Sequence, residues 1–125
     1  MSSNDEAESL SMTAAANDWL TDHEFDLDNA AGRRFVKVFR EVSERYDDDH
    51  VRDAALLAAA KYLAGLASPS DVGKTLAKAR LAAESQLAAA RIIATLAVTD
   101  GSPESTTANE VGVDRMALRR WLGKR

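Results

Sequence analysis

Cysteine is absent from the chain, and proline, glycine and aromatic residues are scarce. Without cysteine the chain forms neither disulfides nor thiolate metal sites, which agrees with a reducing, cytoplasmic location. Only two prolines and six glycines interrupt its 125 residues, and no stretch alternates apolar and polar residues as a strand does. The sequence also lacks a charged leader and a long uninterrupted apolar span, so we expect neither secretion nor membrane insertion. These absences predict an all-α protein.

Alanine dominates the apolar residues, which make up 46% of the chain, whereas aromatic residues make up only 6%. Small side chains fill a core only when the backbones around them approach closely, as neighbouring helices do. The fold that we expect is therefore a helical bundle, in which a long helix leads into a C-terminal helix-turn-helix.

Lysine and arginine are missing from residues 1–28, which hold eight of the twenty acidic residues. This segment carries a formal charge of −8, and the remainder, with 16 basic and 12 acidic residues, carries +4. Its start, MSSNDEAES, has too few apolar residues to bury a core. We therefore expect residues 1–28 to form an acidic, largely disordered domain, without structure to about Ser11. Within it, a short helix over Met12–Leu20 is predicted to dock Trp19 onto the body.

Two helices are predicted in the first half of the body. The first runs from about Asn29 to Tyr46, capped by Asp28 or Asn29, because apolar residues recur on one face at helical spacing. These are Phe35, Phe39, Val42 and Tyr46. The second runs from about Asp49 to Ala67. One face of this helix is lined by Val51, Ala55, Ala58 and Tyr62, the apolar stripe is widened by Leu56 and Leu63, and we expect the helix to pack on both sides.

The run Asp47-Asp48-Asp49-His50 between these helices contains the residue types that bind hard cations or zinc. Consecutive residues on a turn point in different directions, however, and the spacing of a calcium loop is missing. The acidic residues also stand where the next helix needs negative charge at its N-terminus. We therefore interpret the run as a helix start and expect no metal site.

A long helix is predicted from Pro69 to about Val98. Ser68 caps it, proline takes its first position, and Asp71 follows three residues after the cap. Small and aliphatic residues spread around several sides of this helix, so it needs more than one packing partner. Two alternatives stay open for that surface: a subunit interface, or an intramolecular core. Residues 29–98 together form the predicted helical body.

Residues 104–123, ESTTANEVGVDRMALRRWLG, have the spacing of two short helices joined by a sharp turn. Ala108 is small enough to lie where the two helices cross. Gly112 falls where the first helix must end with a positive φ, a conformation that glycine adopts without strain. Asp114 follows as an N-cap for the second helix. The side chains expected to pack between the helices are those of Ala108, Val113, Leu118 and Trp121.

This run resembles the tri-helical, homeodomain-like helix-turn-helix of bacterial and phage regulators, transposases and DNA invertases, whose second helix reads the major groove. The segment from Ile92 to Gly101 resembles the supporting first helix, so residues 92–125 form the predicted module. Two positions depart from the family pattern. Thr107 replaces an aliphatic residue, and Asp114 replaces the usual Ser or Thr cap. Both departures keep the fold, and both are expected to lower affinity for DNA.

The resemblance implies that outward-facing side chains of the second helix contact DNA. Arginine suits bidentate recognition of guanine and also pairs with phosphate. Arg115 and Arg119 are therefore predicted to read bases, Met116 to contact a thymine methyl group, and Lys124 and Arg125 to contact phosphate. The predicted DNA-binding residues are Arg115, Met116, Arg119, Arg120, Lys124 and Arg125. The alternative is a solvated basic helix that only closes a helical domain.

Catalysis finds no support in the sequence. Neither His23 nor His50 has a serine or carboxylate neighbour that would make a nucleophile and base, and no glycine-rich turn suits a cofactor. The resemblance instead implies sequence-specific binding of double-stranded DNA by a small bacterial or phage transcriptional regulator, acting as a homodimer or higher homo-oligomer. Two alternatives are a phage DNA-packaging (small terminase-like) recognition subunit with a ring-forming body, and a protein-interaction adaptor whose helix-turn-helix is degenerate.

Overall fold

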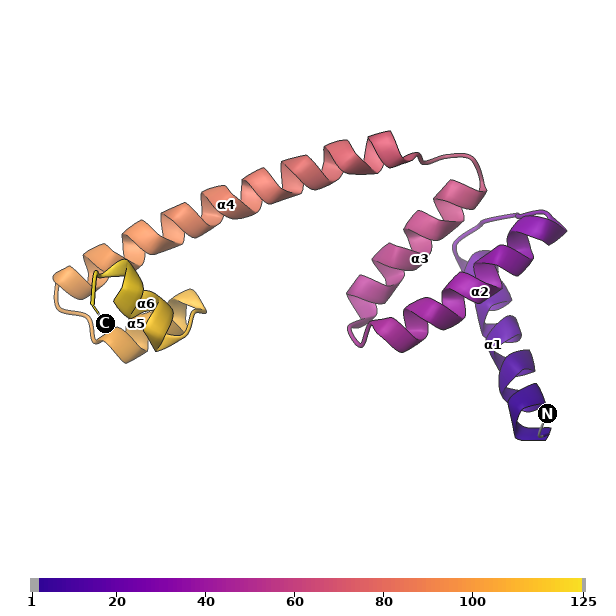
Figure 1. Ribbon diagram of the computed structural model, residues 1–125, viewed down its shortest axis with the longest axis horizontal. Helices are drawn as coiled ribbons and strands as arrows, with labels where there is room; N and C mark the ends of the chain where they lie inside the picture. Colours follow the sequence, from indigo (N-terminus) through magenta and orange to yellow (C-terminus); the bar gives the residue numbers. More distant parts are fainter. Residues whose placement is uncertain (1–2, 125) are drawn as a thin grey trace. The chain divides into compact units, whose positions relative to one another are not determined.

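The computed structural model describes residues 3–124 of the chain, and every regular element in that range is a helix. This confirms the all-α prediction. The packing divides the chain into two compact units, Met1–Val72 and Gly73–Arg125, which we call the N-terminal unit and the C-terminal unit. Figure 1 shows the helices labelled in chain order.

The N-terminal unit contains α1 (Ser3–Asp22), α2 (Asn29–Arg45) and α3 (Asp49–Leu63). Helix α2 packs against both of the others (Figure 1). Phe35 of α2 is fully buried, and its ring centroid lies 5.4 Å from that of Trp19 and 6.2 Å from that of Phe39. The other buried side chains of this core are those of Ala16, Leu20, Val42, Leu56 and Ala60.

The N-terminus differs from the sequence prediction, because α1 begins at Ser3 and replaces the disordered start that we expected to about Ser11. Residues 1–2 lie outside the described residues. Ala16 and Leu20 anchor the second half of α1 in the core, so the exposed first half only has to extend a helix that already exists, which avoids the cost of nucleation. Asp5 and Glu6 in the first turn favour this extension because they offset the helix dipole.

The predicted start of α2 is confirmed by its cap, since the Asp28 carboxylate accepts a hydrogen bond from the Ala31 backbone N–H at 2.8 Å. The predicted end of α3 was too late, because the helix stops at Leu63. Gly65 adopts a φ of 78°, and the Leu66 N–H donates to the Lys61 carbonyl at 2.8 Å. These features close the helix with a Schellman motif.

Helix α3 is buried on one side only, although we expected it to pack on both sides. Val51 and Tyr62 of the predicted face are 47% and 54% exposed, whereas Leu56, which the prediction placed in the wider apolar stripe, is buried together with Ala60. Helix α3 carries apolar residues on most of its circumference, so periodicity does not single out one face. The neighbouring helix α2 determines which face of α3 is buried, because Phe35 and Val42 of α2 share one core with Leu56 and Ala60.

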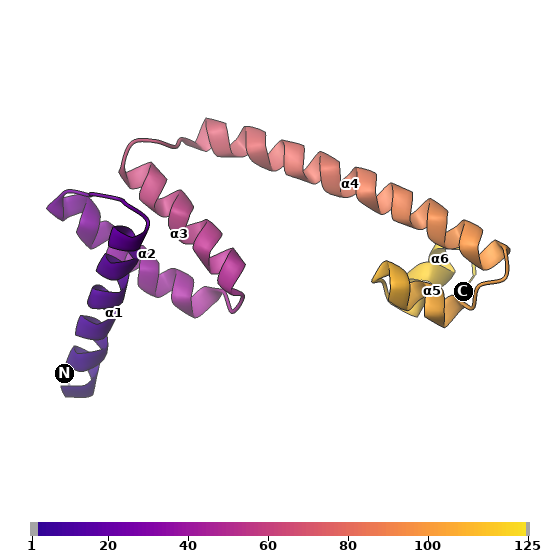
Figure 2. The same cartoon turned by 180° about the vertical axis from the view of Figure 1, so that it is seen from behind.

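Helix α4 (Pro69–Thr99) begins at the boundary between the units and supplies most of its length to the C-terminal unit. Its predicted start is confirmed by the cap at Ser68, because the Asp71 N–H donates to the Ser68 hydroxyl at 3.2 Å and that hydroxyl donates to Asp71 Oδ2 at 2.9 Å. Helices α5 (Glu104–Val111) and α6 (Arg115–Trp121) follow, and both pack near the C-terminal end of α4 (Figure 2).

Candidate nucleic-acid interface

A small apolar core holds α4, α5 and α6 together. Ala94, Ala108 and Leu118, one from each helix, are 0%, 2% and 0% exposed. Partly buried side chains surround them: Val98, Val111, Val113, Trp121 and Leu122. The small alanine side chains let the three helix backbones approach closely, and Leu118 fills the space between them. The sequence prediction that Ala108, Val113, Leu118 and Trp121 pack together is confirmed.

The turn between α5 and α6 is three residues long and adopts the predicted geometry. Gly112 lies in the left-handed region, with φ 84° and ψ 29°, and its N–H donates to the Ala108 carbonyl at 2.9 Å. Asp114 has extended backbone angles, and its carboxylate accepts a hydrogen bond from the Ala117 N–H at 2.7 Å. The glycine therefore ends one helix and the aspartate starts the next, which fixes the angle at which α6 leaves the turn.

Thr107 takes part in this core, although a hydroxyl group is unusual there. It is 4% exposed, and its hydroxyl donates to the Pro103 carbonyl at 2.9 Å. A buried hydroxyl costs free energy mainly when it lacks a partner. The Thr107 hydroxyl is therefore accommodated within this core by its hydrogen bond.

Five of the six predicted DNA-contacting residues lie within the described range, on or just after α6. Arg115, Met116 and Arg120 are exposed on α6. Arg119 is more enclosed, with 27% of its side chain exposed, and Lys124 is half exposed. Arg125 lies outside the described residues. Helix α6 therefore presents two arginines and a methionine to solvent in the register that the sequence predicted.

Glu104 brings three of these cations together, and sequence reasoning missed it. Its carboxylate accepts hydrogen bonds from Arg119 Nη1 at 2.9 Å and Lys124 Nζ at 2.6 Å, and Arg115 Nε lies 3.7 Å away. Only 14% of the Glu104 side chain is exposed. We call these four residues the Glu104 cluster. The only sequence signal was an acidic residue in the first turn of α5; the turn at Gly112 brings residues 15 and 20 positions away beside it.

The cluster lowers the pKa of Glu104. The hydrogen bond from Lys124 contributes most to the shift; partial burial opposes it, and the hydrogen bond from Arg119 and the two positive charges add to it. Since the folded-state pKa lies below the unfolded-state value, the ionised cluster stabilises the C-terminal unit above the ordinary glutamate pKa. That contribution is lost as the pH falls through the lowered value.

We expect Glu104→Gln to lower the free energy of unfolding of the C-terminal unit at neutral pH. The difference from the unchanged protein should shrink as the pH is lowered below 4.5, the ordinary pKa of a glutamate. The measurement is urea unfolding followed by fluorine NMR of fluorotryptophan-labelled protein, because one of the two tryptophans, Trp121, packs in this unit. Glu110→Gln, an exposed change on the same helix, is the control. A difference that stays constant with pH would contradict the ionic role.

The acidic residues Asp48 and Asp49 cap α3 and form a local ion pair. The Asp48 carboxylate accepts a hydrogen bond from the Val51 N–H at 3.0 Å and caps α3. Asp49 pairs with Arg52, which also donates to the Tyr46 carbonyl at 3.0 Å. Across the described part of the chain, no group of three or more His, Cys, Asp or Glu residues is arranged to hold a metal ion.

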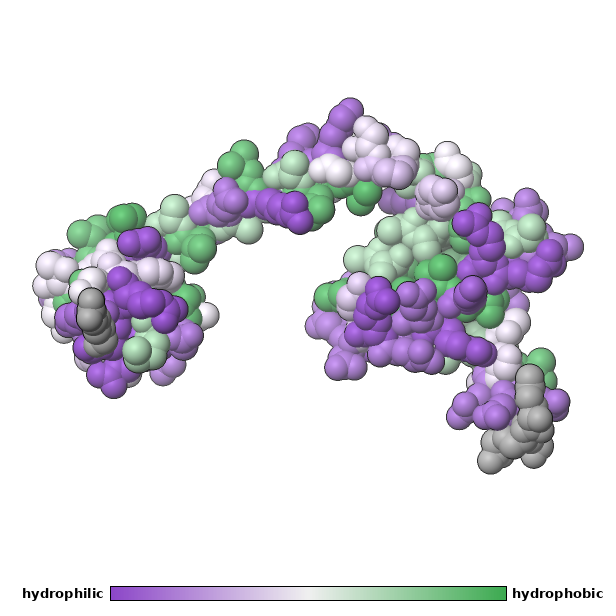
Figure 3. All heavy atoms as spheres, viewed as in Figure 1, coloured by the Kyte–Doolittle hydropathy of each residue, from purple (hydrophilic) through white to green (hydrophobic). Residues whose placement is uncertain are grey.

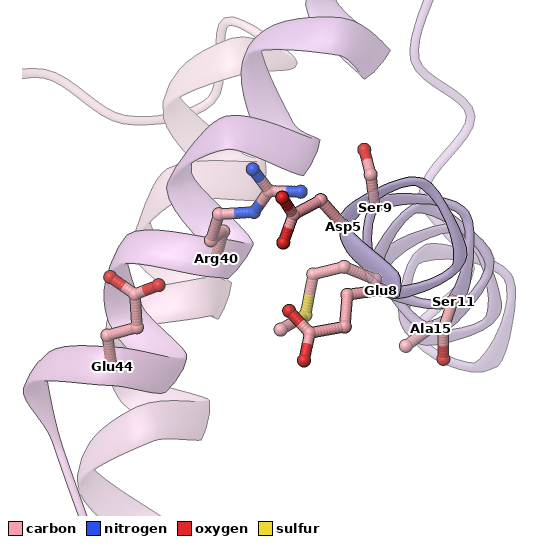
Figure 4. Close-up of a pocket in the computed structure, with 8 residues that line it drawn as sticks. Asp5, Glu8, Ser9, Ser11, Ala15, Arg40 and Glu44 are labelled. Carbon is pink, nitrogen blue, oxygen red and sulfur yellow. The ribbon is translucent and has the colours of Figure 1, made fainter. Parts of the chain in front are cut away.

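A groove of about 560 Å³ opens between α1 and α2 in the N-terminal unit (Figure 4). Arg40 and Asp5 point toward each other across it. Its lining is acidic and hydroxyl-rich: Asp5, Glu8, Ser9, Ser11, Met12, Ala15, Arg40 and Glu44. Three carboxylates against one guanidinium disfavour a phosphate-bearing ligand. The groove therefore shares no residue with the basic surface of α6, and its lining carries the opposite net charge.

Helix α4 is the one helix, among the residues described, that is long and apolar enough to cross a membrane by length and composition. Only 6% of its most apolar window is buried. Its apolar side chains reach the surface along much of the helix (Figure 3). Length and composition are weak grounds for a membrane span, and the same window contains Glu84 and Arg91, which are costly in a bilayer.

Comparison of the chain with protein-family models, with curated proteins and with solved structures finds no match.

Proposed function

We propose that this protein binds double-stranded DNA sequence-specifically, with α6 as the recognition helix of a tri-helical helix-turn-helix formed by the end of α4, α5 and α6. The observation that carries the proposal is that a helix-turn-helix turn and an exposed basic helix occur together on one short segment. A left-handed glycine and a capping aspartate set the turn, and the helix that follows exposes Arg115, Met116 and Arg120. Such a helix, supported from behind by two others, fits the major groove.

The distribution of charge supports this assignment. The C-terminal unit, residues 73–125, has nine Lys and Arg residues and five Asp and Glu residues, a formal charge of +4. The N-terminal unit, with seven basic and fifteen acidic residues, carries −8. Attraction to a polyanion is therefore concentrated in the unit that contains α6.

The cations of the Glu104 cluster differ in how firmly Glu104 holds them. Arg119 and Lys124 are held by hydrogen bonds to Glu104, whereas Arg115 is 63% exposed and lies only at ion-pair distance. An oriented guanidinium loses less conformational entropy when it binds a base edge. In the proposed complex Arg115 and Arg119 read bases, Arg120 and Lys124 contact phosphate or base edges nearby, and Met116 contacts a thymine methyl group. The sequence prediction adds Arg125 to the phosphate contacts.

The biological role that we propose is that of a small cytoplasmic transcriptional regulator acting as a homodimer, with no catalytic activity. A DNA-packaging recognition subunit uses the same module, and the exposed apolar residues of α4 favour it to the extent that they build a ring. A protein-interaction adaptor is favoured instead if Glu104 neutralises the basic surface so fully that DNA no longer binds. Light scattering separates a dimer from a ring, and salt-dependent duplex binding separates both from the adaptor.

We expect Arg115→Ala to weaken binding to the preferred site by about 1–3 kcal/mol and to relax the preference at one base pair, because a bidentate contact to a base edge is lost. The preferred site is first selected from random duplexes with the unchanged protein. Affinities for this site and for random duplex are then measured by fluorescence anisotropy at several salt concentrations.

Arg80→Ala is the matched control, because it removes the same side chain from an exposed position on α4 of the same unit. It should lower affinity for preferred and random duplexes by the same small factor. Equal losses on both duplexes for Arg115→Ala would remove Arg115 from base recognition. No salt-dependent duplex binding by the unchanged protein would overturn the proposed function itself.

A further inference from the structure

One side of α4 presents a row of apolar residues to solvent. Leu81, Ala88, Ile92 and Leu96 recur at intervals of seven, four and four residues, so they lie along one side of the helix. We call this row the back face of α4. Leu81, Ile92 and Leu96 are 65%, 58% and 57% exposed. Ala94, in contrast, lies on the opposite side and is fully buried against α5 and α6.

This exposed row is large in comparison with the core of its own unit, in which the buried apolar side chains are those of Ala94, Ala108 and Leu118. Removing apolar surface from water stabilises by about 25 cal/mol per Å², so covering the back face would add substantially to the stability of the unit. At about 1.5 Å per residue, the 31 residues of α4 are also long enough for an interface of standard size.

The charges beside the back face indicate what covers it. Glu84 and Arg91 are the only charged residues between Leu81 and Val98. They are seven residues apart, which places both on the same edge of the back face, two turns from each other. Neither forms an ion pair with another of the described side chains. A surface with one charge of each sign, spaced along one edge, is complementary to a second copy of itself turned end for end.

We propose that two copies of this chain pair through the back faces of their α4 helices in antiparallel orientation. The two-fold axis passes between Leu87 and Ala88, so that Glu84 lies opposite Arg91 of the partner subunit, and the reverse pair forms on the other side of the axis. The small side chain of Ala88 at the axis lets the helices approach closely. In a parallel pair the two-fold axis would run along the helices and place the charged edges of the two copies on opposite sides of the interface, so neither Glu84 nor Arg91 would gain a partner of opposite charge.

A second consequence rests on the proposed function, whereas the pairing itself does not. With the axis between Leu87 and Ala88, the Thr99 ends of the two α4 helices lie about 35 Å apart along the pair. Adjacent half-sites on one face of duplex DNA are about 34–36 Å apart, centre to centre. Antiparallel pairing therefore separates the α5 and α6 helices of the two copies by a distance that suits two successive major grooves.

The first test is charge reversal, followed by analytical ultracentrifugation of the full chain without DNA. In the antiparallel pair, Glu84→Arg and Arg91→Glu each replace two attractions by two repulsions, so each should weaken dimerisation roughly tenfold. The double variant E84R/R91E should restore it. Both positions are exposed, so the variants should keep the fold, which the fluorotryptophan resonances check. Single reversals that leave dimerisation unchanged would overturn the pairing.

The second test uses the absence of cysteine, which makes introduced thiols the only ones in the chain. Ala88→Cys should form a disulfide-linked dimer under mild oxidation, and Leu96→Cys alone should not. A mixture of Leu81→Cys and Leu96→Cys chains should form the mixed dimer. Efficient self-linking of Leu96→Cys would show parallel pairing and overturn the proposal.

Three other outcomes also overturn it. If the chain stays monomeric at high micromolar concentration, the back face does not mediate pairing. If the chain forms a ring, it associates through a different interface. Binding of the unchanged monomer to phosphatidylcholine vesicles shows a lipid partner instead. Because every measurement is made without DNA, failure of the pairing is separate from failure of DNA binding, and Arg115→Ala should dimerise like the unchanged protein even if DNA binding fails.

Discussion

Leu118→Ala is expected to unfold the C-terminal unit and to abolish DNA binding. Leu118 is completely buried, with 0% of its surface exposed, and it lies between α4, α5 and α6. Truncating a buried leucine to alanine costs about 2–5 kcal/mol. A unit of this size, whose other buried apolar side chains in this core are two alanines, has little stability beyond that amount.

The two tryptophans allow this effect to be located. Trp19 packs in the N-terminal unit and Trp121 in the C-terminal unit. In Leu118→Ala, the fluorotryptophan resonance of Trp121 should move to its unfolded position, while that of Trp19 stays where it is. Met116→Ala removes a side chain of similar size from an exposed position of the same helix and should change stability by no more than about 0.5 kcal/mol. A folded Leu118→Ala variant that still binds DNA would contradict the assignment of Leu118 as the central core residue.

Phe35→Ala is expected to unfold the N-terminal unit, with a loss of about 3–5 kcal/mol, because it empties the site between α1, α2 and α3. The phenylalanine ring is fully buried and contacts Trp19 and Phe39 at ring-centroid distances of 5.4 and 6.2 Å. Its loss also removes those aromatic contacts. The resonance of Trp19 should report the unfolding directly.

The same variant tests whether the two units fold independently. Since the core of the C-terminal unit contains no residue of α1, α2 or α3, the resonance of Trp121 and the affinity for duplex DNA should be retained in Phe35→Ala. Tyr62→Ala, an aromatic truncation at a position that is 54% exposed in the same unit, is the control and should leave both resonances in place. Simultaneous loss of both resonances in Phe35→Ala would show that the chain folds as a single cooperative unit.

Local signals in the sequence were sufficient to place most helix boundaries. Asp28, Ser68 and Asp114 each accept a hydrogen bond from a backbone N–H three residues later, as their positions predicted. Gly112 adopts the left-handed conformation that ends α5. Each of these features depends on interactions within about four residues, so it can be predicted from the local sequence and does not depend on tertiary packing. The same is true of the exposed register of Arg115 and Met116, which follows from the cap at Asp114.

Only the tertiary structure decided which sides of the helices are covered and which charges meet. Helix α3 is apolar around most of its surface, and its core face was chosen by Phe35 and Val42 of α2. The first half of α1 is helical because its second half is anchored. Glu104 collects cations from 15 and 20 residues further along the chain because the turn between α5 and α6 folds them back. Burial and ion pairing between distant residues depend on how elements pack, and that information is absent from the spacing within any one of them.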